Sequence, residues 1–324
     1  PVRTTRDSGG DALIEGGRST QTPAEKTAMS RDAHERRGDV AVRGRGFPSA
    51  SARTAPGRAR PDAMVYGAVM LAHQSRGNGP RIVVALHGFL GSGRNLGGLV
   101  RAWTERNPSL CVLTPDLLGH GRSPPMPPEP SLEALADAVL AWMDELDVQS
   151  AEVVGHSLGG RVGLVARAQA PDRISRLDLL DITPGPIPVT DTDHVVSVLT
   201  SAPDRAPDRQ PIVDFLREHG LPAGLVQWLS MNLERAAEGD IRWRIDRRRL
   251  ADYHHRTRGQ SLWWAVEAHP ERLRLLAGGR SPFVSDADVT RLRALGVPVD
   301  TLEDAGHFVH ADATEAVVDW LARE

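Results

Sequence analysis

From Met64 to the C-terminus, short apolar runs alternate with longer segments in which apolar residues recur every three or four positions. The short runs are typical of buried strands, and the longer segments of amphipathic helices. Strands are expected at 66–73, 81–86, 109–114, 151–154, 174–180, 272–277 and 297–302. Helices are expected at 96–106, 132–146, 158–168 and 313–323. This alternation predicts an α/β protein with a mostly parallel central sheet and helices on both faces.

Residues 183–270 interrupt the alternation, because no convincing strand is visible there. Helical spacing appears instead at 193–199, 211–218, 224–236 and 247–255. We therefore expect a helical cap, inserted after the sixth strand, between two parts of one core at 63–182 and 271–324. In open α/β sheets the ligand lies at the carboxyl edge of the strands, which such a cap would cover.

Residues 1–62 are rich in Gly, Pro, Ser, Thr, Ala and Arg and have no sustained apolar period. Such a segment buries too little apolar area to offset its ordering entropy. We expect a disordered N-terminal tail, or an upstream extension ahead of a start near Met64.

Composition excludes several classes of function. The chain has 324 residues and a net charge of −3, which favours neither nucleic acid nor a membrane surface as a partner. No apolar stretch approaches the ~20 residues that span a bilayer. Cys111 is the single cysteine, so no intrachain disulfide can form, and a cytoplasmic location is expected. No Cys/His cluster has metal-ligand spacing, so neither a metal nor a cofactor is predicted. The expected partner is a small molecule, and the oligomeric state stays open.

The segment 153–160, VVGHSLGG, is the strongest chemical signal. It has the pattern G-x-S-x-G, in which a serine stands on a sharp turn between a strand and a helix. Gly155 and Gly159 are small enough for the crossing backbones, and Ser157 would project its hydroxyl above the sheet. Ser157 is therefore the predicted nucleophile.

A serine hydroxyl needs a base that removes its proton. His307 follows the last expected strand and precedes the closing helix, so it lies in a loop at the same sheet edge. The negative charge that develops on a carbonyl oxygen needs fixed N–H donors. We expect these donors at Leu158, the first residue of the helix, and at Phe89, in the loop after the strand 81–86.

The acid that would orient His307 has two candidate locations. One is the loop after the strand 272–277, where the obvious position holds Ser281 and the next carboxylates are Asp286 and Asp288. The other is Asp181, directly after the strand 174–180 and one strand along from the serine. A carboxylate buried there is costly unless its charge is used. We therefore predict Asp181 as the acid and keep Asp286 in reserve.

Several segments in this order resemble the α/β-hydrolases: LHGFLGSGRNL (86–96), PDLLGHGRSP (115–124), VVGHSLGG (153–160), LLDITP (179–184), WRIDRRRL (243–250), LLAGGRSPFV (275–284) and AGHFVH (305–310). Within that superfamily the chain is similar to the YbfF-type esterases and the abhydrolase domain-containing protein 11 group. The resemblance implies hydrolysis of short- to medium-chain acyl esters or thioesters through an acyl-enzyme, under a mobile cap. It also favours Asp181, because the GG-x-S segment of that group lacks the usual acid. Phe89, Trp228 and Phe308 are candidates to line the acyl pocket.

Other functions remain open. The glycine-rich segment 91–98, with Asp116 about 20 residues after it, is a weak match to a dinucleotide site, but it leaves Ser157 without a role. C–C bond hydrolysis and cofactor-free haloperoxidase activity use the same three residues. A ligand receptor on a hydrolase frame is the non-enzymatic alternative.

Overall fold

A computed structural model describes residues 70–187 and 191–323 of the unit Met64–Glu324. The predicted tail at 1–62 and the first half of the first predicted strand, residues 66–69, therefore lie outside the described residues.

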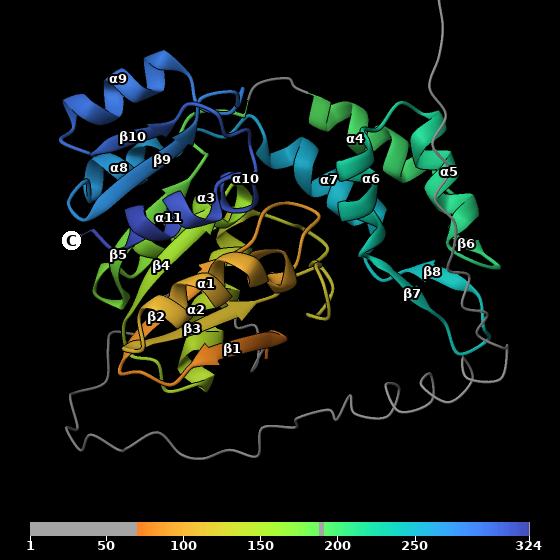
Figure 1. The fold of residues 1–324 in the computed structure, drawn as a ribbon, viewed down its shortest axis with the longest axis horizontal. Helices are drawn as coiled ribbons and strands as arrows, with labels where there is room; N and C mark the ends of the chain where they lie inside the picture. Colours follow the sequence, from red (N-terminus) through yellow and green to blue (C-terminus); the bar gives the residue numbers. More distant parts are fainter. Residues whose placement is uncertain (1–69, 188–190, 324) are drawn as a thin grey trace, which may run out of the picture. The chain divides into compact units, whose positions relative to one another are not determined.

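The centre is a seven-stranded sheet with the order β1-β3-β2-β4-β5-β9-β10 (Figure 1). β1 pairs with β3 in antiparallel fashion, and the other neighbours are parallel. The strands are β1 (His73–Gly77), β2 (Arg81–Leu86), β3 (Leu110–Pro115), β4 (Ala151–His156), β5 (Ile174–Leu180), β9 (Leu273–Gly278) and β10 (Val299–Leu302). The predicted fold class is confirmed, and six strands match predicted runs closely. β1 begins at His73, where the predicted first strand ends.

Apolar side chains fill both faces of the central strands, which explains the uninterrupted apolar runs. In β2, Val84 and Leu86 belong to one core cluster, while Val83 and Ala85 belong to the other. Successive side chains of a strand point to opposite faces, so one short run supports two helical layers.

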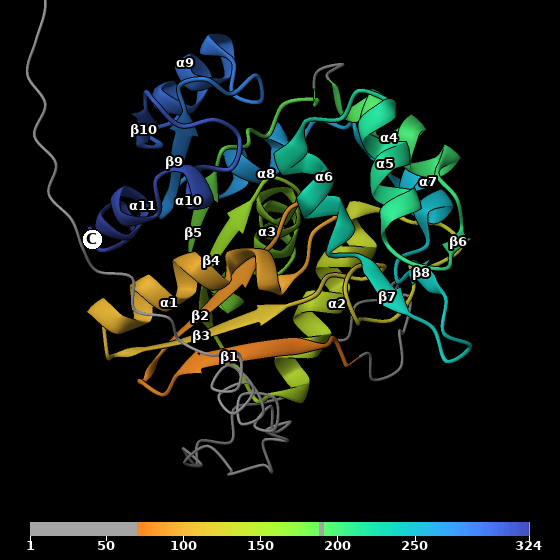
Figure 2. The same cartoon turned by 45° about the vertical axis from the view of Figure 1, so that its right-hand side comes forward.

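The helices divide between these two faces (Figures 1 and 2). One layer contains α1 (Gly97–Arg106), α10 (Val309–Asp312) and α11 (Thr314–Leu321), with the short η1 (Gly93–Leu96) before α1. The other contains α2 (Leu132–Glu145), α3 (Leu158–Gln169) and α8 (Trp263–Ala268), and η2 (Pro171–Arg173) follows α3. α9 (Asp286–Ala294) contacts β10. Because α3 packs on β2, β4 and β5, it fixes its first turn at the carboxyl ends of these strands.

The insertion, residues 183–270, follows β5, the fifth strand of the described part rather than a sixth. It contains α4 (Asp191–Ser201), α5 (Gln210–Glu218), α6 (Ala223–Ser230) and α7 (Arg247–Thr257), in addition to α8. The expectation that it lacks strands is wrong. β6 (Arg205–Ala206), β8 (Ile241–Trp243) and β7 (Leu233–Arg235) form a small antiparallel sheet, so the helix predicted at 224–236 ends at Ser230.

The physical reason is a short hairpin. Buried and exposed residues alternate in β8, as the pleat requires, whereas exposure increases along β7. Gly239 takes a φ of +100° in the turn between the two strands. With only three residues on each side of the turn, the alternation is too brief to compete with a helical pattern.

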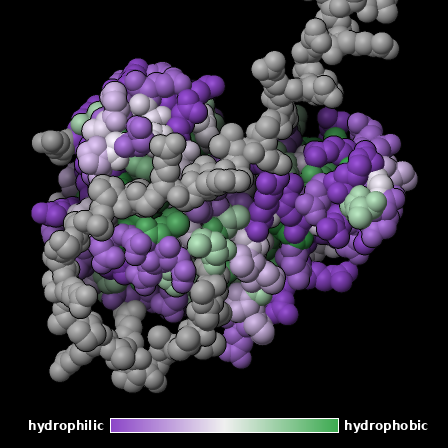
Figure 3. All heavy atoms as spheres, turned by 90° about the horizontal axis from the view of Figure 1, so that it is seen from below, coloured by the Kyte–Doolittle hydropathy of each residue, from purple (hydrophilic) through white to green (hydrophobic). Residues whose placement is uncertain are grey.

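One face of the molecule is dominated by hydrophilic residues, with hydrophobic residues confined to smaller areas (Figure 3). None of the described helices combines the length and the apolar character needed to cross a membrane.

Candidate active site

Ser157 occupies the abrupt turn between β4 and α3. Its φ of 51° and ψ of −116° lie outside the regions that non-glycine residues prefer. A Cβ on Gly155 would lie 2.5 Å from the Gly160 backbone, and one on Gly159 would lie 2.3 Å from the Leu86 carbonyl oxygen. The two glycines of the motif therefore allow the backbones to cross, and the surrounding packing holds Ser157 in its strained conformation.

Asp181 follows β5 directly and is fully buried, with a φ of 53°. Its Oδ1 accepts a hydrogen bond from the Gly278 amide at 2.7 Å. Its Oδ2 lies 2.7 Å from His307 Nδ1 and also accepts a hydrogen bond from the Ser281 hydroxyl. Three donors thus compensate the burial of this carboxylate, and one of them is the predicted base.

The reserve residue Asp286 lies elsewhere. It is the exposed first residue of α9, and none of its described contacts involves His307. Ser281, which stands in the obvious acid position of the late loop, donates to Asp181 instead of replacing it. The geometry therefore brings Asp181, and not Asp286, to His307.

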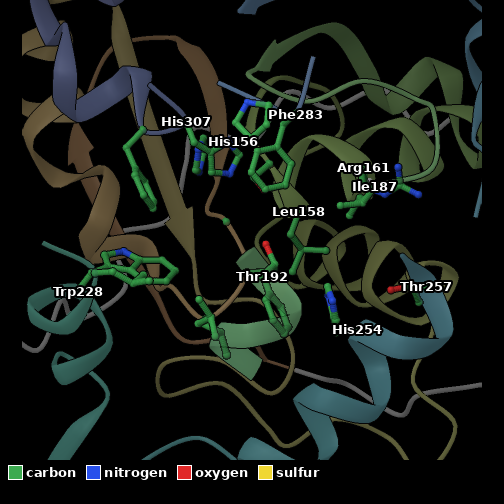
Figure 4. Close-up of a pocket in the computed structure, with 18 of the residues that line it drawn as sticks. His156, Leu158, Arg161, Ile187, Thr192, Trp228, His254, Thr257, Phe283 and His307 are labelled. Carbon is green, nitrogen blue, oxygen red and sulfur yellow. The ribbon is translucent and has the colours of Figure 1, made fainter. Parts of the chain in front are cut away.

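Ser157 and His307 border one cavity of about 290 Å³. Among the described residues no hydrogen bond joins the Ser157 hydroxyl to His307, and such bonds are often long before a substrate binds. In Figure 4, His307, His156 and Phe283 lie on one side of Leu158, and Thr192 and His254 on the other. The Phe283 ring stacks on His307 with centroids 3.9 Å apart, which restricts the orientation of the imidazole.

The two predicted oxyanion donors lie beside this serine. Leu158 begins α3, so its amide has no partner within the helix. Phe89 follows Gly88, which passes so close to the elbow that a Cβ there would lie 2.8 Å from His156 Nδ1. Phe89 and Leu158 both line the cavity.

His87 holds the loop that carries Phe89. Its Nε2 accepts a hydrogen bond from the Leu117 amide at 2.9 Å, so its Nδ1 carries the proton and donates to the Gly88 carbonyl at 2.8 Å. Burial lowers the pKa of His87 to about 4, which keeps the ring neutral at neutral pH. The fixed tautomer therefore orients the loop without adding charge.

His156 and His310 support the loop that carries His307. His156 Nε2 donates to the His307 carbonyl at 2.8 Å, and the His310 ring lies 4.5 Å from the His156 ring. Burial and, to a smaller extent, the neighbouring His307 lower the pKa of His310 to about 4, and burial lowers the pKa of His156 as well. Two neutral imidazoles therefore pack behind His307.

We expect His310→Phe to flatten the pH dependence of stability. An unfolded histidine ionises near pH 6.5 and folded His310 near pH 4, so between these values the unfolded chain binds one more proton. The wild-type free energy of unfolding should therefore decrease as the pH falls through this window. In the variant, the slope of the free energy of unfolding against pH should be smaller by up to about 1.4 kcal/mol per pH unit. Urea unfolding from pH 7 to pH 4.5 measures it, and an unchanged slope would contradict a neutral buried His310.

The exposed His255 offers the control for this experiment. His255→Phe removes a histidine without changing a buried one, so it should leave the slope as in the wild type.

The predicted pocket residues Phe89, Trp228 and Phe308 all border the cavity, and the rings of Trp228 and Phe308 lie 5.6 Å apart. Phe283 and His254 are among the lining residues that sequence reasoning missed. Phe283 stands two residues after Ser281, in a segment already singled out, whereas His254 has no motif around it.

Asp116 is the possible ribose ligand of the dinucleotide alternative, but both of its carboxylate oxygens accept hydrogen bonds from backbone amides. Its Oδ1 accepts from the Gly93 amide at 2.8 Å and its Oδ2 from the Arg122 amide at 2.9 Å. The glycine-rich segment and the carboxylate are thus tied to each other, which argues against that alternative.

Known proteins resemble this chain along most of its length. A family model described as "Alpha/beta hydrolase family" matches residues 83–320. The mouse protein "sn-1-specific diacylglycerol lipase ABHD11" is 28% identical over 251 residues, which cover 73% of this chain and 78% of that protein. "Esterase YbfF" of Escherichia coli (strain K12) is 29% identical over 260 residues, 78% of this chain and 95% of the esterase.

Among solved structures, a "Marine microorganism esterase" superposes with a TM-score of 0.67 and covers 78% of this chain and 98% of its own. At 22% identity this likeness shows the fold alone. The resemblance inferred from the sequence motifs is confirmed by the family model and by the two relatives. The chain belongs to the alpha/beta hydrolase family.

Proposed function

We propose that the chain is a serine hydrolase that cleaves carboxylic esters through an acyl-enzyme. One observation carries this proposal: Ser157, on its strained turn, borders the same cavity as His307, whose Nδ1 lies 2.7 Å from the buried Asp181 carboxylate. Family membership and the names of the esterase and lipase relatives support the same chemistry.

In the first half-reaction, His307 Nε2 removes the proton from the Ser157 hydroxyl while Oγ attacks the ester carbonyl carbon. The oxygen becomes an oxyanion, which the amides of Phe89 and Leu158 bind. Asp181 accepts the Nδ1–H bond of His307, fixes the tautomer and stabilises the imidazolium. The intermediate then collapses, and the alcohol leaves with the proton from Nε2.

In the second half-reaction, water attacks the acyl-enzyme and loses its proton to His307. Collapse of the second oxyanion breaks the bond to Oγ, and His307 returns the proton to Ser157. The carboxylic acid leaves, so no oxidant, metal or cofactor enters the balance.

The cavity wall supports an apolar acyl group as the substrate part that binds there. Ile187, Val195 and Leu225 come from the insertion, and Phe283 and Phe308 from the core. We infer that the insertion acts as a cap that closes over a short- to medium-chain acyl ester or thioester. A cytoplasmic location remains a prediction from the sequence.

Replacing Leu225 with Trp should shorten the preferred acyl chain. The larger side chain fills part of the cavity, so long acyl chains lose more space than acetate does. We expect the ratio of kcat/KM for p-nitrophenyl octanoate over acetate to fall on the order of tenfold, since excluded methylenes each contribute about 0.8 kcal/mol. An unchanged ratio would place the acyl chain elsewhere.

A p-nitrophenyl ester series from acetate to dodecanoate tests the function itself. It should be combined with labelling by a fluorophosphonate, which reacts covalently with activated serines. We expect hydrolysis of the shorter esters and labelling at Ser157. A protein that hydrolyses no ester and resists labelling would leave the receptor alternative.

A further inference from the structure

The cavity contains a second histidine, His254, which the proposed mechanism does not use. It belongs to α7 and lies on the other side of Leu158 from His307 in Figure 4. The side chain is buried, and its ring stacks on Phe89 with centroids 5.5 Å apart. His254 therefore borders the space in front of Ser157 and contacts the residue proposed to bind the oxyanion.

One nitrogen of His254 is already engaged. Its Nε2 lies 3.1 Å from Asp193 Oδ1, and the other oxygen of Asp193 lies 3.5 Å from an Arg258 nitrogen. Burial lowers the pKa of His254, so at neutral pH the ring is neutral and has one donor and one acceptor. Because a carboxylate can only accept, Nε2 carries the hydrogen and Nδ1 presents a lone pair.

Nδ1 has no hydrogen-bond partner within residues 70–187 and 191–323. Much of the cavity wall supplied by the insertion is apolar, including Ile187, Val195 and Leu225. Nδ1 is not one of the fully enclosed polar atoms that lack a partner, so a donor in the cavity can reach it. An acceptor in a largely apolar wall is poorly satisfied until it receives a hydrogen bond. The missing donor can come from a molecule that occupies the cavity.

The charge of the cavity narrows the nature of this donor. Arg161 also borders the cavity, is buried and gives its guanidinium hydrogen bonds to the carbonyls of Gly185 and Gln260. Burial lowers its pKa only to about 10, so it remains a cation, and no carboxylate in the described part of the chain pairs with it. A second cation such as an ammonium group is therefore disfavoured, whereas an uncharged hydroxyl is not.

We infer that His254 Nδ1 accepts a hydrogen bond from a hydroxyl group of the substrate, so that the chain prefers esters that carry a hydroxyl. Asp193 is a positioning residue, because it fixes the tautomer of His254. This inference rests on the proposed function for the identity of the substrate as an ester.

Two sets of matched esters test the inference, one for each side of the scissile bond. The alcohol set is 2-hydroxyethyl, 2-methoxyethyl and propyl butyrate. The acyl set is the ethyl esters of 3-hydroxybutyrate, 3-methoxybutyrate and 3-methylbutyrate. The set that places its hydroxyl against His254 should show a preference. In that set we expect kcat/KM for the hydroxyl ester to exceed kcat/KM for the methyl analogue on the order of tenfold. The methoxy ester has the oxygen but no hydrogen to donate, so its kcat/KM should not exceed that of the methyl analogue.

His254→Phe keeps a ring against Phe89 and removes the acceptor, so the ratio of hydroxyl to methyl ester should fall to about one. Asp193→Asn should lower the ratio as well, because an amide can donate to Nε2 and release the tautomer. A purely structural role would slow both esters equally and leave the ratio unchanged. His255→Phe, on the exposed neighbour, is the matched control and should retain the wild-type ratio.

Binding of the same esters to Ser157→Ala protein, measured by calorimetry, separates this inference from the proposed function. It needs no turnover, so it remains decisive even where no ester is hydrolysed and the proposed function fails. The hydroxyl ester should bind on the order of tenfold more tightly than its methyl analogue. The inference is overturned if the hydroxyl ester does not bind or binds no more tightly than its methyl analogue. It is also overturned if the ratio of kcat/KM is one in both sets, or if the preference survives in His254→Phe.

Discussion

Ser157→Ala should lower kcat/KM for p-nitrophenyl butyrate by a factor on the order of 10⁴ to 10⁶. The substitution removes the only atom that can form the proposed acyl-enzyme, while the amides of Phe89 and Leu158 remain beside the cavity. The residual activity should come from those donors and from binding, and KM should change little. Initial rates and the loss of fluorophosphonate labelling measure the effect.

The folded state of this variant is the necessary control. Ser157 has a φ of 51°, and alanine has the same preference against this region, so the thermal unfolding midpoint should stay close to that of the wild type. A folded Ser157→Ala protein that retains most of its activity and its labelling would refute Ser157 as the nucleophile.

Asp181→Asn should lower kcat on the order of 10⁴-fold. The amide keeps the shape of the carboxylate but can present its NH₂ group to His307, which favours the imidazole tautomer with the proton on Nε2. That tautomer cannot accept the proton of Ser157. The substitution also removes the negative charge that stabilises the imidazolium. The loss of activity should therefore appear in kcat rather than in KM.

Asp286→Asn is the matched control, since this carboxylate is exposed at the start of α9. Its activity should equal that of the wild type. The reverse result, with full activity in Asp181→Asn and loss in Asp286→Asn, would move the acid to the late loop and require that loop to rearrange when substrate binds.

The core of the fold could be predicted because its strands are buried on both faces. The run from Arg81 to Leu86 contains apolar residues for two helical layers, so its boundaries are visible in the sequence. That Ser157 and His307 border one cavity could be predicted, because the motif places the serine on a turn at the carboxyl edge of the sheet and the histidine follows a strand that ends at the same edge. Asp181 followed from the cost of a buried carboxylate, and its contact with His307 is consistent with that reasoning.

Features that depend on several segments at once could not be predicted. The hairpin of β7 and β8 is too short for its alternation to stand out. The bond from Ser281 to Asp181 joins residues 100 positions apart, so only the fold brings them together. His254 shares the cavity with Ser157 because α7 packs on α4, and no local pattern marks that packing.

The position of Asp181 also has a consequence for synthesis of the chain. Asp181 comes directly after β5, yet the described donors to its carboxylate lie at Gly278, Ser281 and His307. While the insertion is being made, β9 does not yet exist, so β5 is an open sheet edge that ends in an uncompensated acid. A chain that stops before β9 should therefore aggregate through this edge, and the segment from β9 onward supplies both the strand that covers β5 and the donors that compensate Asp181.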